Sequence, residues 1–261
     1  MIGNSMLRAV SVISPEFVYY YLNQIVTFGC AYIIGTGQYG TRTSEMFADH
    51  STLWAVMIRI TALIIAALPL TWSMKKEYPV MIPGKKNRGR HIVFVVVLAV
   101  GTALLANVLA SLSGFSSSSD AFEKTAANQF SLPVWAGLLV YGLVTPITEE
   151  IVHRGVIYNR LRRYFNLPIA VVVSSLLFGI SHGNLVQLIY GAVMGVLICL
   201  VYERYGAFIY PLVYHCVANA VIYVFMSSPI LRAAVFSVPG IALEALMTVA
   251  GVYMIFAPKN Y

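Results

Sequence analysis

The feature that most limits how this chain can fold is its series of long apolar segments, separated by short polar connectors. A membrane-spanning helix needs about 20 apolar residues, and the 261-residue chain offers about eight such segments. They run at about 16–36, 52–74, 92–112, 133–157, 167–182, 185–203, 207–227 and 235–257. Only 10% of the residues are charged, whereas a soluble domain has roughly 25%. The sequence therefore predicts an all-α, polytopic membrane helical bundle of about eight transmembrane helices, forming one transmembrane domain over 1–261.

The basic residues are concentrated in the connectors, which is the distribution that orients a membrane protein. The largest connector, 75–91, carries Lys75, Lys76, Lys85, Lys86, Arg88 and Arg90. If this connector is cytoplasmic, alternation of the spans places both termini in the cytoplasm. Membrane orientation thus accounts for the net charge of +7. We expect a multi-pass protein of the cell membrane that contacts the lipid bilayer and binds no nucleic acid.

Two adjacent carboxylates, Glu149 and Glu150, lie within an apolar segment and are followed by Arg154. Residues four apart share a face of an α-helix, so Glu150 is expected to form a buried ion pair with Arg154 and not to pair with a histidine. Glu149 points about 100° away and is left without this partner. Ionisable residues inside a bilayer are rare and usually functional. The spacing therefore nominates Glu149 as the reactive acid, with Glu150 and Arg154 as structural support for the site.

Two further segments carry histidines. His182 ends the shortest span and precedes Gly183, so it could lie in a connection that dips into the membrane, and Phe178 one turn earlier could hold it in place. Such irregular backbone is tolerated at that depth only where it is buried in protein or lines a water-filled cavity. His215 and Asn219 are four residues apart and share a helix face. Together they would supply two hydrogen-bond donors of the kind that stabilise an oxyanion.

Isolated residues elsewhere carry less information. Arg59 and Glu244 lie within apolar segments and are expected to snorkel or to pair with another helix; a functional role for either is left open. Cys30, Cys199 and Cys216 show no paired spacing for a metal or a disulfide, and we interpret them as small core residues.

Three short motifs resemble those of the CPBP intramembrane proteases, also called the CAAX-processing or bacteriocin-immunity (Abi) family, and a bacterial member is favoured. They are Glu149-Glu150-Ile151-Val152-His153-Arg154, Phe178-Gly179-Ile180-Ser181-His182 and His215-Cys216-Val217-Ala218-Asn219. The motifs follow the order of the family and define a protease-like core at 133–223. Residues 1–132 are left as N-terminal membrane spans with little chemistry.

The resemblance implies a glutamate-dependent endopeptidase that needs no metal and no cofactor. Glu149 and His182 would activate the attacking water, and His215 and Asn219 would stabilise the oxyanion. His153 departs from the family, which usually has an apolar or aromatic residue there; it either tunes Glu149 or faces a neighbouring helix. The implied partner is a membrane peptide or a lipidated protein, as substrate.

Two other functions stay open from the residues alone. Glu149, His153, His182 and His215 could ligate zinc in a membrane protease, although the His-Glu-x-x-His pattern is absent. A non-catalytic membrane regulator or an immunity protein acting by partner binding would have the same fold. The substrate and the cleavage site cannot be predicted from the sequence.

Overall fold

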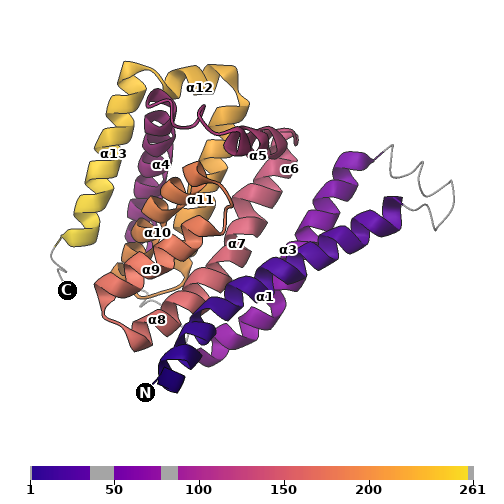
Figure 1. The fold of residues 1–261 in the computed structure, drawn as a ribbon. Coiled ribbons are helices and arrows are strands. Elements are labelled where there is room, and N and C mark those ends of the chain that lie inside the picture. The colour runs from indigo at the N-terminus through magenta and orange to yellow at the C-terminus, as the bar shows by residue number, and fades with distance from the viewer. Residues whose placement is uncertain (1, 36–49, 78–87, 258–261) are drawn as a thin grey trace.

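The computed structural model describes residues 2–35, 50–77 and 88–257, and every regular element within these ranges is a helix (Figure 1). In chain order these are α1 (Ile2–Gly35), α3 (Ser51–Glu77), α4 (Arg88–Leu112), α5 (Asp120–Phe130), α6 (Val134–Gly137), η1 (Leu138–Val144), α7 (Thr145–Glu150), η2 (Ile151–Tyr158), α8 (Asn159–Tyr164), α9 (Leu167–Ile180), α10 (Leu185–Tyr205), α11 (Ile209–Ser227), α12 (Pro229–Val235) and α13 (Val238–Phe256). The prediction of an all-α, polytopic helical bundle is confirmed.

Within the described ranges, six helices are long and apolar enough to cross a membrane. They correspond to six of the eight expected spans: Ser51–Lys76, Gly89–Leu112, Val134–Tyr164, Leu185–Tyr205, Ile209–Ser227 and Val238–Phe256. The other two differ from the prediction. Helix α1 has 34 residues but is not apolar enough to count among these six. Helix α9 has only 14 residues, about 21 Å at helical rise, so it is too short to cross.

The helix Val134–Tyr164 is not a regular α-helix. Its segments η1 and η2 are π-helical and flank the six-residue α-helical segment α7. Pro146 near the start of α7 lacks an N–H group, so it cannot make the usual bond to the preceding turn. Short π-helical segments often occur at functional sites, and here they lie on both sides of the acidic pair.

The helices pack as two groups around this central helix. Helices α4, α10, α11 and α13 share one hydrophobic core, which includes Leu98, Ile198, Tyr214 and Ile255. Helices α1 and α3 pack against each other and against η2, and Figure 1 shows them as an antiparallel pair on the side of the bundle opposite α13. The central helix thus joins the two groups.

Helices α9 and α10 approach closely because small residues line their contact. A Cβ atom added to Gly179 would lie 2.3 Å from the backbone oxygen of Leu188, and one added to Gly195 would lie 3.0 Å from Ser175. Small residues spaced in this way let the backbones of membrane helices approach closely. The contact fixes the end of α9, and therefore the position of the turn that follows it.

The side of the membrane on which each end lies stays a prediction. Figure 1 shows the start of α1 and the end of α13 at the same end of the bundle, away from α5 and α12. Most of the basic connector on which the orientation depends, residues 78–87, lies outside the described residues, as does Lys259.

Candidate active site

The acidic pair lies at the centre of Val134–Tyr164. Glu149 and Glu150 end α7, and η2 follows immediately. Because residues five apart are hydrogen-bonded in a π-helix, the faces of this segment differ from those of a regular α-helix. Glu150 and Arg154 nevertheless meet, as their four-residue spacing predicted, and His153 pairs with α1.

Glu150 is fully buried and accepts two hydrogen bonds on one oxygen. Nη1 of Arg154 and Nδ1 of His215 each lie 2.8 Å from its Oε1. The predicted pair of Glu150 with Arg154 is confirmed, but the expectation that Glu150 avoids the histidines is wrong. Since a carboxylate oxygen carries more than one lone pair, it can hold the guanidinium of its own helix and the imidazole of α11 together.

Arg154 connects the acidic helix to two other helices. Its Nη2 donates to the backbone oxygen of Gly195 on α10 at 3.2 Å, and its guanidinium carbon lies 4.6 Å from the centre of the Phe178 ring on α9. The side chain is fully buried. Arg154 thus anchors the α9–α10 contact to Glu150, and its role as support for a catalytic site stays a prediction.

Glu149 occupies a different environment from its neighbour. Its side chain is 19% exposed, compared with 0% for Glu150, and its Oε2 lies 3.6 Å from Nε2 of His215. It lines a cavity of about 400 Å³. His215 therefore lies between the two carboxylates, with one ring nitrogen directed at each.

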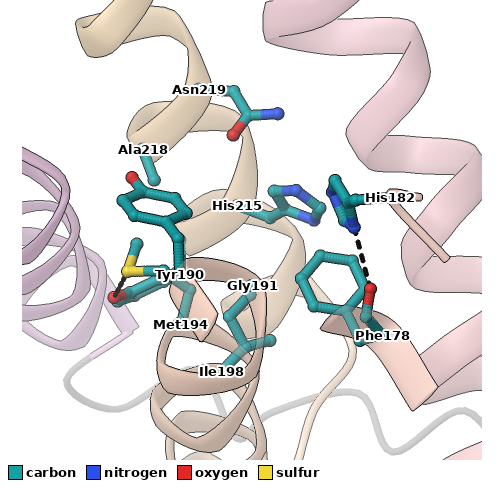
Figure 2. A pocket seen from close by; sticks show the side chains of 10 residues that line it. Phe178, His182, Tyr190, Gly191, Met194, Ile198, His215, Ala218 and Asn219 are labelled. Carbon is teal, nitrogen blue, oxygen red and sulfur yellow. Dashed lines mark hydrogen bonds between the residues drawn. The ribbon is translucent and has the colours of Figure 1, made fainter. Parts of the chain in front are cut away.

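His182 lies in the turn after α9, as its position before Gly183 predicted. Gly183 has φ 76°, a left-handed conformation that glycine adopts without strain. Nδ1 of His182 lies 2.8 Å from the backbone oxygen of Phe178 (Figure 2). Because a carbonyl only accepts, Nδ1 carries the hydrogen, and Nε2 of the neutral ring is left with its lone pair.

Phe178 is surrounded by the polar groups of the site. Its ring centre lies 5.1 Å from that of His182, 5.4 Å from that of His215 and 5.0 Å from that of His153, each in an edge-on arrangement. Figure 2 shows the imidazoles of His182 and His215 beside this ring. The expected packing of Phe178 against His182 is confirmed and extends to two further histidines.

Asn219 lies one turn after His215 on α11, and both line a small cavity of about 40 Å³ with His182 (Figure 2). Nδ2 of Asn219 also donates to the backbone oxygen of Tyr141 at 3.2 Å. The two side chains share a face as predicted. However, Nδ1 of His215 is occupied by Glu150, so only Nε2 of that ring can serve a substrate.

Two residues of α1 that contact the acidic helix were not predicted from the sequence. Nε2 of His153 lies 3.3 Å from Oε2 of Glu16, and the hydroxyl of Tyr19 lies 2.9 Å from that of Thr148, next to Glu149. His153 therefore faces a neighbouring helix, one of its two predicted roles. The sequence feature that could have indicated this contact is Glu16 itself, the single acidic residue within Ile2–Gly35.

The two cavities adjoin, since His182, Tyr190 and Asn219 line both. The larger one also reaches α5, through Phe122, Thr125, Ala126, Gln129 and Phe130. Arg59, for which a functional role was left open, also lines the larger cavity. Glu244 is buried on α13 and does not line this cavity. A helix that the sequence analysis did not predict thus forms one wall of the cavity.

The donors considered for zinc are not arranged as one ligand set. One ring nitrogen of His215 contacts Glu150, and one of His153 contacts Glu16. One ring nitrogen of His182 is bound to a backbone oxygen. Across the part of the chain that the structure describes, no group of three or more His, Cys, Asp or Glu side chains is placed to hold a metal ion. The geometry gives the zinc hypothesis no support.

The helical bundle thus places a carboxylate, two histidines and an asparagine around two adjoining cavities. Residues 131–221 match the family described as Type II CAAX prenyl endopeptidase Rce1-like. The chain is also 24% identical over 196 residues to YdiL of Bacillus subtilis (strain 168), whose name describes a proposed membrane peptidase; the match covers 73% of this chain and 78% of that protein. No solved structure matches significantly. Both matches support a domain of the CPBP, or CAAX protease, family at residues 131–221 of this chain.

Proposed function

We propose that this protein is a glutamate-dependent intramembrane endopeptidase in which Glu149 is the general base. The observation that carries the proposal is that Glu149, His182 and Asn219 line one cavity of about 400 Å³. Typical ligand cavities have volumes of about 300–1,000 Å³, so this one can take a few residues of an extended peptide. The base, a second acceptor and a donor would then face the same peptide bond.

The attacking water binds between Glu149 and His182. Glu149 is the partly exposed carboxylate, whereas Glu150 is held by Arg154 and His215. Nε2 of His182 accepts one hydrogen of the water, because Nδ1 is already committed to Phe178. Glu149 removes the other hydrogen as the oxygen attacks the carbonyl carbon, as a general base does when positioned within hydrogen-bond reach.

The oxyanion that forms is stabilised from α11. Asn219 donates through its amide, and preorganised donors of this kind contribute several kcal/mol to catalysis. His215 takes part through Nε2, which lies 3.6 Å from Glu149. It receives the proton from Glu149, donates to the oxyanion and then protonates the leaving nitrogen as the C–N bond breaks. The water has then supplied a hydroxyl to the carbon and a hydrogen to the nitrogen.

We propose a membrane-associated or lipidated peptide as the substrate. The protein is a multi-pass membrane protein, and its matched family is described by its action on CAAX prenyl substrates. The cavity combines polar groups such as Gln129 and Gln187 with apolar ones such as Phe130 and Ile222. This mixture suits a peptide backbone that carries apolar side chains.

The test is hydrolysis of a prenylated, internally quenched peptide by purified protein in detergent, after treatment with a chelator. Glu149→Gln should lower kcat by about 10²–10⁴-fold or more, while the control Glu203→Gln, which changes an exposed pair with Arg162, should match the parent. If Glu149→Gln cleaves as fast as the parent, the glutamate mechanism is wrong. Activity that is lost with the chelator and returns with zinc would establish a metalloprotease instead. A parent without activity whose Glu149→Gln variant still complements a deletion strain would indicate a binding partner.

A further inference from the structure

Helix α1 lies outside the matched family region, 131–221, yet it contacts the acidic helix on both sides of Glu149. Tyr19 binds Thr148, one residue before Glu149. Glu16 binds His153, four residues after it. Glu16 is also close enough to Glu149 for the two carboxylates to interact electrostatically. Two contacts from one helix thus bracket the proposed base.

The hydrogen on His153 can be assigned from its surroundings. The side chain is 2% exposed, and Nδ1 has no hydrogen-bond partner among the described residues. A neutral imidazole carries one N–H group, and the carboxylate of Glu16 can only accept when it is ionised. Nε2, which lies 3.3 Å from Oε2 of Glu16 in an ion-pair contact and not an aligned hydrogen bond, is therefore the nitrogen that carries the hydrogen. A carboxylate that fixes the tautomer and orientation of a histidine in this way is a recurring arrangement in active sites.

The same imidazole packs against the centre of the site. His153 meets Phe178 edge-on, at 5.0 Å between ring centres, and Phe178 in turn contacts both His182 and His215. The backbone oxygen of Phe178 also holds Nδ1 of His182. A shift of His153 would therefore be transmitted through one ring to both of the other histidines.

We propose that Glu16 and His153 form a carboxylate–imidazole pair through which the first helix positions Glu149 and, by way of Phe178, His182. Both are positioning residues, and the first helix is part of the active site. The inference rests on the proposed protease function, because its effect is exerted on the groups that act there. It also assigns a purpose to the residue at which this chain departs from its family, and to the one acidic residue of α1.

The experiment is a double-mutant cycle on the full-length protein, using Glu16→Gln, His153→Phe and the combined variant. Glu16→Gln removes the negative charge that lies 3.3 Å from Nε2 of His153, so kcat should fall by about 10- to 100-fold with KM nearly unchanged. His153→Phe leaves Glu16 without its partner beside Glu149 and should lose at least as much. In the combined variant Glu16 no longer carries a charge that lacks a partner. The fold decrease in kcat should therefore be smaller than the product of the two single decreases. Glu203→Gln is the matched control for the change from carboxylate to amide.

Melting temperature and folded fraction are measured for each variant, and kcat is expressed per folded molecule. A purely structural pair would lower the folded fraction and leave kcat per folded molecule at the parent value, which would overturn the inference. Equal kcat for Glu16→Gln and Glu203→Gln, or losses that simply multiply, would also overturn it. Glu149→Gln is assayed in parallel: if it is inactive while Glu16→Gln is fully active, only the positioning role fails. If Glu149→Gln is fully active, the proposed function fails first.

Discussion

Replacing Arg154 by alanine should destabilise the protein severely. The side chain is fully buried and makes three contacts: with Glu150 at 2.8 Å, with the Gly195 backbone oxygen at 3.2 Å and with the Phe178 ring at 4.6 Å. Without it, the buried carboxylate of Glu150 keeps only the His215 donor. Removing one partner of a buried ion pair typically costs about 3–5 kcal/mol. That is a large part of the roughly 5–15 kcal/mol by which a folded protein is stable.

Arg162→Ala is the matched control, since it removes an arginine whose pair with Glu203 is 34% and 32% exposed. Such exposed pairs contribute about 0–1 kcal/mol. Unfolding of both variants in mixed micelles of detergent and denaturing surfactant gives the two free energies, and we expect a difference of at least about 2 kcal/mol. A difference below about 1 kcal/mol would refute the reasoning, because Glu150 would then tolerate the loss of its cation.

The double variant Glu150→Gln with Arg154→Met separates the buried charge from the packing. The amide oxygen can still accept from His215, and methionine fills part of the space without a charge. Replacing a buried ion pair by neutral groups of similar volume is often close to neutral for stability. The double variant should therefore be more stable than Arg154→Ala. If both are equally unstable, the lost packing explains the effect and the unpaired carboxylate does not.

Two further predictions concern α9 and α11. Gly179→Ala should destabilise the fold by about 1–3 kcal/mol, because its Cβ would lie 2.3 Å from the backbone oxygen of Leu188. A Cβ added at Gly29 has no atom within 4 Å, so the control Gly29→Ala should unfold at or above the parent temperature; equal melting temperatures for the two variants would contradict the close packing at Gly179. Asn219→Ala should lower kcat by about 10²–10³-fold with KM retained, and a change confined to KM would show that Asn219 binds substrate without stabilising the oxyanion.

The sequence predicts the helical class, six of the spans and the Glu150–Arg154 pair because each depends on local pattern. Apolar length identifies a span, and a spacing of four residues places two side chains on one face. For His153 the local pattern left two roles open, and the structure shows that it faces Glu16 on a neighbouring helix. The π-helical segment Ile151–Tyr158 was not predicted either.

The contacts between distant helices could not be predicted from spacing. His215 reaches Glu150, and Glu16 reaches His153, through a tertiary arrangement that no periodicity records. The first segment was predicted to carry little chemistry, yet its one carboxylate faces His153. Helix α5, Asp120–Phe130, was missed because it is short and polar, and its contribution is to line the larger cavity.

The two adjoining cavities have a kinetic consequence. A bound peptide that fills the larger cavity would block the route by which water reaches Glu149 and His182. The smaller cavity, of about 40 Å³, exceeds the roughly 10–15 Å³ that one water needs, and His182, His215 and Asn219 supply it with polar partners. Under the proposed mechanism, a water held there would stay beside His182 while a peptide fills the larger cavity, and the nucleophile would be loaded before the substrate.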